Sequence, residues 1–256
     1  MTEQATAPIW PRPYWQPSDE TALLHFYVFG QFAPELVIPA ARYGSPGLPA
    51  GVTLERFQNL ALQRWEGYPL KGALGELLKE DDPATFERAR IAPDVLVLRG
   101  QRPDSETLDY LRDTLGVLAG LLDAGASAIL DPQILSLFDA RHWRERYLID
   151  GGAPPRHHVL IVRTADDASG RSRVRTRGMR KFGRPDIDLH HVPDAQIDRA
   201  GALCEQLVEL EALGAQFTDG QPLAIEGVPG DLVARRGGSL DDPEFNNRHV
   251  AFRWPD

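Results

Sequence analysis

The sequence of 256 residues contains only one cysteine, Cys204. A single cysteine excludes an intramolecular disulfide and any zinc site that is built from several cysteines. Leu203, Leu207 and Leu210 surround it at a spacing typical of the apolar face of a helix. We therefore predict that Cys204 is a buried thiol that packs as a small hydrophobic residue, and that it is not a nucleophile.

A targeting segment, a long apolar run and a surplus of basic residues are also missing. The start, MTEQATAPIWPRPYWQP, has neither the basic region nor the apolar run of a signal peptide. The longest apolar stretch, residues 116–130, is interrupted by Asp123 and is too short to cross a bilayer. We expect a cytoplasmic protein without a membrane partner, or one exported without a cleavable signal. The net charge of −9 argues against nucleic acid as a partner.

Several common catalytic motifs do not occur in the chain. There is no G-x-x-x-x-G-K-[ST] phosphate loop, no G-x-G-x-x-G after a strand, no G-x-S-x-G elbow and no H-E-x-x-H. These absences argue against the common nucleotide-binding, serine-hydrolase and zincin classes, although they do not exclude an enzyme. No motif indicates a cofactor.

What the sequence does contain from residue 94 onward is a regular order of strands and helices. Apolar periodicity predicts helices over residues 104–124, 139–148 and 194–213. It predicts strands over residues 94–99, 127–130, 157–163, 171–177, 186–191, 223–225, 232–234 and 249–254. This order favours an α+β fold, in which helices pack on one face of a mixed, largely antiparallel sheet with split β-α-β, or ferredoxin-like, character.

The first ninety residues are predicted to form an N-terminal α/β extension. Residues 23–29 have the composition of a strand, and residues 53–65 have helical spacing with Thr53 as N-cap. We expect a single domain over residues 1–256. The alternative is an extension of residues 1–92 followed by an α+β core of residues 93–256.

Two tryptophans near the amino terminus, Trp10 and Trp15, lie among four prolines. Proline fixes its own φ angle and restricts the residue before it, so this segment is predicted to be extended. The two indoles either dock on the body of the protein, the interpretation that we favour, or form an aromatic arm that binds a partner.

The basic residues concentrate in residues 171–184, which contain seven of them and no acid. Arg171, Arg173, Arg175 and Arg177 alternate with other residues, so they share one face of a predicted strand. Asp186, Asp188 and His190 alternate in the same way on the next strand. They can form a catalytic or metal-binding face, but we favour exposed carboxylates that are neutralised by the arginines of the neighbouring strand.

The turn between these two strands, residues 178–185, is bounded by glycines. Met179 and Phe182 are predicted to pack inward and to leave Arg180, Lys181 and Arg184 exposed. Exposed basic side chains on such a turn are candidates for binding a partner or an anion such as phosphate or carboxylate. The alternative is a rigid turn with a solvated exterior.

The run T-x-G-M-x-x-F-G-x-P-D-I-D, from Thr176 to Asp188, resembles the signature T-x-G-[LM]-x-x-[FL]-G-x-P-[DE] of an uncharacterised bacterial domain family. The stretch Asp123–Ile129 also resembles that family, and the resemblance covers about residues 95–213. It implies no catalytic residue. By analogy alone, small acidic bacterial domains of this kind suggest immunity or antitoxin proteins.

Two functional hypotheses follow. The first is a non-enzymatic module that binds another protein, such as an immunity protein that binds its cognate toxin, with Trp10, Trp15 and the basic turn as candidate contacts. The second is an enzyme or ligand-binding protein that acts on an anionic small molecule through Asp186, Asp188, His190 and the same turn.

Overall fold

The computed structural model describes residues 8–166, 170–226, 228, 230–242 and 245–255. These residues form two compact units, each assembled from segments that are distant in the sequence. The first unit comprises residues 8–11, Leu23–Arg102 and Thr107–Ala153. The second comprises Arg12–Ala22, Pro103–Glu106 and the described residues from Pro154 onward. The alternative division into residues 1–92 and 93–256 does not coincide with these units, because residues 92 and 93 both lie in the first unit. The single domain over residues 1–256 stays a prediction.

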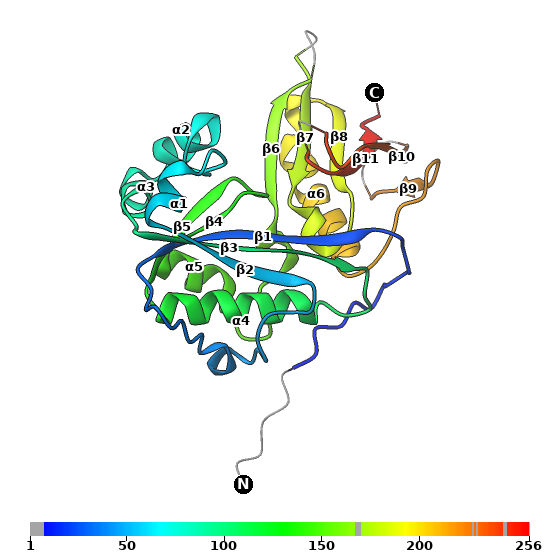
Figure 1. Ribbon diagram of the computed structural model, residues 1–256. Coiled ribbons are helices and arrows are strands. Elements are labelled where there is room, and N and C mark those ends of the chain that lie inside the picture. Colours follow the sequence, from blue (N-terminus) through cyan, green and yellow to red (C-terminus); the bar gives the residue numbers. More distant parts are fainter. Residues whose placement is uncertain (1–7, 167–169, 227, 229, 243–244, 256) are drawn as a thin grey trace. The chain divides into compact units, whose positions relative to one another are not determined.

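The first unit contains a five-stranded sheet with the strand order β2-β3-β1-β4-β5 (Figure 1). Its strands are β1 (Thr21–Gly30), β2 (Val52–Gln58), β3 (Asp94–Pro103), β4 (Ala126–Asp131) and β5 (Ser136–Asp139). The pairs β2–β3, β1–β4 and β4–β5 are antiparallel. Antiparallel pairing of this kind suits strands that are joined by short connections, as β4 and β5 are.

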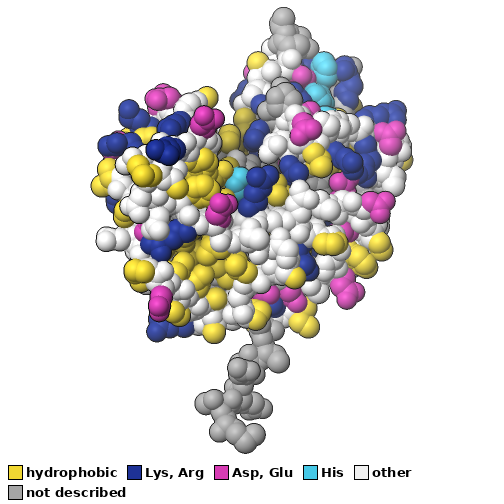
Figure 2. Space-filling view, in the orientation of Figure 1, with side chains coloured by type: hydrophobic (Ala, Val, Ile, Leu, Met, Phe, Trp, Pro, Cys, Tyr) yellow, Lys and Arg dark blue, Asp and Glu magenta, His cyan; other side chains and the backbone are white. Residues whose placement is uncertain are grey.

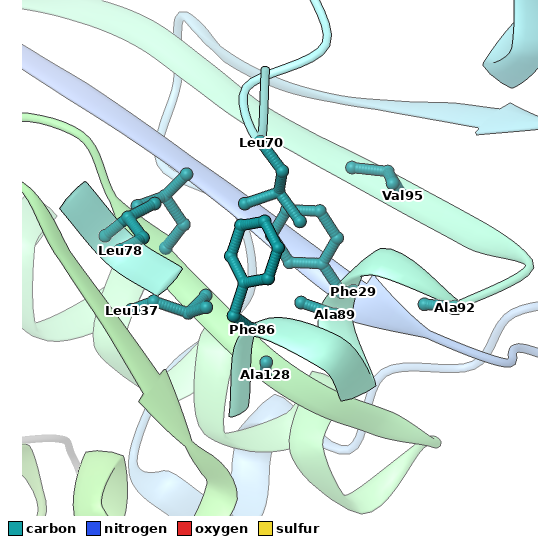
Figure 3. Close-up of a cluster of buried hydrophobic side chains, with 10 residues drawn as sticks. Phe29, Leu70, Leu78, Phe86, Ala89, Ala92, Val95, Ala128 and Leu137 are labelled. Carbon is teal, nitrogen blue, oxygen red and sulfur yellow. The ribbon is translucent and has the colours of Figure 1, made fainter. Parts of the chain in front are cut away.

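The described residues of the first unit form α-helices and a short 3-10 helix, Ala40–Tyr43. The α-helices follow in chain order. They are α1 (Asn59–Arg64), α2 (Gly72–Asp81), α3 (Pro83–Arg90), α4 (Asp109–Asp123) and α5 (Ala140–Tyr147). Leu78 of α2 and Phe86 of α3 pack with Phe29 and Leu70 in a buried cluster (Figure 3). Burying each of these side chains contributes about 1.5–3 kcal/mol, so the cluster is a main source of stability for this end of the unit.

The second unit contains a six-stranded sheet with the strand order β6-β7-β8-β11-β10-β9. Its strands are β6 (Leu160–Ala165), β7 (Ser172–Arg177), β8 (Asp186–Val192), β9 (Pro222–Ala224), β10 (Asp231–Gly238) and β11 (Arg248–Arg253). Only the central pair, β8 and β11, is parallel. Helix α6 (Ile197–Ala212) packs against β7 and β8 (Figure 1).

The expected α+β class with largely antiparallel strands is confirmed, but the strands are divided between two sheets. The ferredoxin-like detail is not confirmed. The helix predicted over residues 53–65 is wrong for its first half, because residues 52–58 pair residue by residue with β3. Thr53 does not cap a helix; its Oγ1 donates to the carbonyl of Arg99 at 3.2 Å.

Candidate functional site

Strand β7 alternates between buried and half-buried residues, as its period-two pattern predicts. Its buried residues are Ser172, Val174 and Thr176, and its half-buried residues are Arg173, Arg175 and Arg177. Strand β8 pairs with it antiparallel, and Arg175 lies opposite Asp188. The expected row of arginines beside a carboxylate of the next strand is therefore confirmed.

Asp188 is buried, with 0% of its side chain exposed, so the expectation of an exposed carboxylate is wrong. Arg173 donates to both of its oxygens, from Nε at 2.7 Å and from Nη2 at 2.6 Å. His190 Nε2 lies 2.9 Å from Asp188 Oδ2. Burial raises the pKa of Asp188, but the hydrogen bonds from Arg173 and His190 outweigh it and hold this pKa below its usual value. The hydrogen bond to Asp188 in turn raises the pKa of His190.

Asp186, at the start of β8, is also buried, so its predicted exposure is wrong as well. It accepts hydrogen bonds from Thr176 Oγ1 at 2.8 Å, Met179 N at 3.3 Å and Asn247 Nδ2 at 2.9 Å. Burial nevertheless raises the pKa of Asp186 to about 6. The structure thus brings Asp188 and His190 together but binds Asp186 to other partners. In the described part of the chain, no three His, Cys, Asp or Glu side chains are grouped as metal ligands.

The basic turn is a 3-10 helix, Met179–Phe182, between Gly178 (φ 114°) and Gly183 (φ 61°). Met179 and Phe182 are buried, so their prediction as apolar anchors is confirmed. The exposure predicted for Lys181 and Arg184 is wrong, because their side chains donate to buried carbonyl groups. Lys181 Nζ donates to the carbonyl of His158 at 2.7 Å. Only Arg180 keeps partial exposure, and its Nη1 donates to the carbonyl of Asn246 at 3.2 Å.

Arg184 belongs to a buried cluster of charged residues that joins four segments of the second unit. Its Nη1 lies 3.0 Å from Asp104 Oδ1, and Arg12 Nη1 lies 2.7 Å from the same oxygen. Both guanidinium groups also donate to carbonyl oxygens at the end of α6, Arg12 to Ala212 and Arg184 to Gly214. The cluster therefore satisfies helix-end carbonyls, which is a structural role.

The two tryptophans near the amino terminus dock on the protein itself, as the favoured interpretation predicts. Both side chains are half-buried. Trp15 Nε1 donates to Asp104 Oδ2 at 3.1 Å. In the first unit, the indole of Trp10 lies so close to Gly152 that a Cβ there would be 2.7 Å from a ring carbon. These contacts place both indoles against the protein itself.

The sheet of the second unit has two unlike faces. The face toward α6 is formed by buried apolar residues, including Ile187, Leu189, Val250 and Phe252. The opposite face, here called the open face, carries half-buried or exposed polar side chains of β7, β8, β11 and β10. Across it, Arg235 lies opposite Ala251, and Ala251 lies opposite Asp188. Two residues further along β11 and β8, Arg253 lies opposite His190.

A pocket of about 550 Å³ is hollowed into this open face around the short side chain of Ala251. Its lining includes His190, Asp231, Val233, Arg235, Ala251 and Arg253, and we call it the Ala251 pocket. In the space-filling view, basic side chains lie beside acidic ones in the region of β10 and β11 (Figure 2).

Three cationic groups line the Ala251 pocket. Arg253 is exposed and has no ion-pair partner among the described residues. Arg235 is 67% exposed and lies 3.8 Å from Asp219, an exposed contact that is weak in water. His190 is held toward its charged form by Asp188, as described above. Asp231 is the one carboxylate in the lining. The pocket is therefore suited to an anion.

The residues of the pocket outside β8 were missed by sequence reasoning, which treated the tail only as short strands. A signal was present in β11, where His249 and Arg253 alternate with the apolar residues Val250 and Phe252. Such alternation predicts a polar face on that strand. It does not predict that this face adjoins Asp188 and His190.

Comparison with protein families, with curated proteins and with solved structures gives no match for this chain. The likeness of about residues 95–213 to an uncharacterised bacterial family therefore stays a resemblance. Among the described residues, no helix combines the length and the apolar character that crossing a bilayer requires.

Proposed function

We propose that the second unit binds an anionic ligand in the Ala251 pocket. The observation that carries this proposal is the guanidinium of Arg253, which is exposed, lacks an ion-pair partner among the described residues and lies beside His190 on the same sheet face. In a chain of net charge −9, cations gathered around one hollow create a local positive potential. Arginine is also the side chain best suited to binding carboxylate or phosphate through two parallel hydrogen bonds.

The arrangement favours binding over acid–base catalysis. His190 Nε2 is bound to Asp188, and its Nδ1 lies 3.6 Å from Asp166 Oδ1. The two carboxylates favour the protonated, positively charged form of His190, whereas a general base needs a neutral nitrogen near the substrate. Asp188 is committed to Arg173 and His190. These pairings support a ligand-binding function for the face.

The protein-interaction hypothesis remains a prediction from the sequence. It relied on exposed tryptophans near the amino terminus and on an exposed basic turn. Both indoles are docked, and Lys181 and Arg184 are buried, so the residues that motivated this hypothesis no longer favour it over ligand binding. An immunity or antitoxin role, and a toxin as partner, therefore have less support than the anionic ligand.

Thermal unfolding of the full chain with added sulfate, phosphate, pyrophosphate or citrate tests the proposal. A ligand at a hundred times its Kd stabilises the native state by about 2.7 kcal/mol. We expect at least one of these anions to raise the melting temperature, with an effect that weakens as sodium chloride is added. We expect the substitution Arg253→Gln to reduce the effect.

The matched control is Arg141→Gln, since the Arg141 side chain is 74% exposed on α5 of the first unit. This variant should retain the full response to anions. The proposal is overturned if Arg253→Gln responds as strongly as Arg141→Gln, or if neither these four anions nor the aromatic anions named below bind to the protein.

A further inference from the structure

We infer that the ligand of the Ala251 pocket is an organic anion that carries an aromatic or branched apolar group, and not an inorganic anion. This inference rests on the proposed function, because it concerns the same pocket. The size of the pocket, its apolar lining and the distribution of charge along β10 support this inference.

The size of the pocket exceeds the needs of a simple anion. A volume of about 550 Å³ lies within the range of roughly 300–1,000 Å³ that is typical of pockets for small organic molecules. Inorganic phosphate, a compact ion, would occupy only a small part of this volume beside the arginines. The remaining space is available to an organic group.

Part of the lining of the pocket is apolar. Ala251 has a short side chain and lies between Arg235 and Asp188, which are opposite it on the two neighbouring strands, so we call Ala251 the floor of the pocket. Val233 and Pro255 contribute apolar lining beside it. An apolar group placed over Ala251 would remove this surface from water, which favours binding in proportion to the area covered.

The charges of the lining are separated along β10. Arg235, Val233 and Asp231 point to the same face, because they are two residues apart on one strand. Asp231 and Arg235 are therefore separated by roughly 13 Å between Cα atoms. An anionic group is attracted to Arg235 at one end of this row and to Arg253, which the register of β10 and β11 places level with Val233 in its middle. A second anionic group at the far end would approach Asp231. The pocket thus selects a ligand that is anionic at one end only.

Calorimetric titration of the full chain with phenyl phosphate, benzoate and inorganic phosphate tests this inference. We expect phenyl phosphate to bind about tenfold or more tightly than inorganic phosphate, because its ring is buried over Ala251. Comparison of phenyl phosphate with benzoate distinguishes a phosphate from a carboxylate as the preferred anionic group. Benzene-1,4-dicarboxylate, which is anionic at both ends, should bind more weakly than benzoate, and Asp231→Asn should reduce that difference.

The substitution Ala251→Leu fills the floor without changing charge, so it should remove most of the advantage of phenyl phosphate over inorganic phosphate. Ala61→Leu is the matched control, since Ala61 is exposed on α1 of the first unit. If Ala251→Leu does not fold, Ala251→Val provides a smaller filling with strong preference for strands.

The outcomes separate the two proposals. Equal affinity for phenyl phosphate and inorganic phosphate overturns the organic ligand and leaves the anion site intact. An advantage that persists unchanged in Ala251→Leu also overturns it, because the ring would then lie elsewhere. Failure of every anion, inorganic and organic, overturns the proposed function itself.

Discussion

Arg184 Nη1 lies 3.0 Å from Asp104 Oδ1, and the two side chains are only 1% and 2% exposed. The same oxygen receives Arg12, whose side chain is fully buried. One carboxylate is therefore shared by two guanidinium groups that have lost their contact with water, and carbonyl oxygens at the end of α6 accept further hydrogen bonds from both. Such pairs are strongly coupled, because removing one member leaves an uncompensated charge in the interior.

We expect Asp104→Asn to destabilise the protein by about 3–5 kcal/mol, the usual cost of breaking a buried ion pair from one side. Urea unfolding followed by circular dichroism measures this change. The matched control is Asp194→Asn, which removes the ion pair with Arg163 at side-chain exposures of 53% and 66%. An exposed pair contributes only about 0–1 kcal/mol. Equal effects of the two substitutions would contradict the structural role of the Asp104 cluster.

Glu211 of α6 is fully buried, and neither of its carboxylate oxygens has a hydrogen-bond partner among the described residues. Burial raises its pKa well above the usual value, although the charge of Arg184 acts in the opposite direction. Because the folded state holds this proton more tightly than the unfolded state, the corresponding stability is complete below the unfolded pKa. This stability is lost as pH rises through the folded pKa. Between the unfolded and the folded pKa, the free energy of unfolding falls by up to about 1.4 kcal/mol for each pH unit.

Glu211→Gln removes this titration and keeps the shape of the side chain. We therefore expect the stability of the variant, relative to the unmodified protein, to increase from pH 5 to pH 8. Denaturant unfolding at both values measures it. A difference in stability that does not change with pH would show that Glu211 titrates normally in the folded protein.

The thiol of Cys204 is 0% exposed, which confirms its prediction as a buried residue. Burial also raises its pKa, so the thiolate that reacts with electrophiles is scarce near neutral pH. We expect a thiol-reactive dye to label the native protein very slowly and to label one group per chain in denaturant. Rapid labelling without denaturant would mean that α6 opens far more readily than its buried contacts imply.

Local signals in the sequence predicted local structure well. Asp139 was expected to start a helix, and its carboxylate accepts a hydrogen bond from His142 N at 2.8 Å at the start of α5. Capping involves residues three positions apart, so a sequence pattern contains the whole interaction. The alternation of arginines in β7 is another local signal, and it correctly predicted their common face.

Interactions between distant segments could not be predicted in this way. Residues 53–58 have helix-like spacing, but pairing with β3, about forty positions away, makes them a strand. The burial of Lys181 and Arg184 depends on carbonyl groups from other segments, which no local pattern reveals. The Ala251 pocket has the same origin, because the parallel pairing of β8 and β11 brings His190 to Arg253. Sequence reasoning therefore identified His190 of the candidate site, but not the pocket residues of β10 and β11.

The charge of His190 should make anion binding depend on pH. Its hydrogen bond to Asp188 raises the pKa of His190 above its usual value, so the imidazolium persists to a higher pH than in a free histidine and is lost as pH rises through the raised pKa. Losing one charge near a bound anion costs on the order of 1 kcal/mol in water-exposed surroundings, about fivefold in affinity.

Sulfate is the suitable probe, because its own charge stays constant over this range whereas that of phosphate does not. We expect the affinity for sulfate to fall from pH 6 to pH 9 in the unmodified protein. The control variant His142→Gln should show the same fall, because the side chain of His142 is 52% exposed on α5 of the first unit. In His190→Gln the affinity should be weaker at pH 6 and nearly independent of pH, because the glutamine carries no charge to lose. A pH dependence that survives His190→Gln would assign the titration to another group and remove His190 from the anion site.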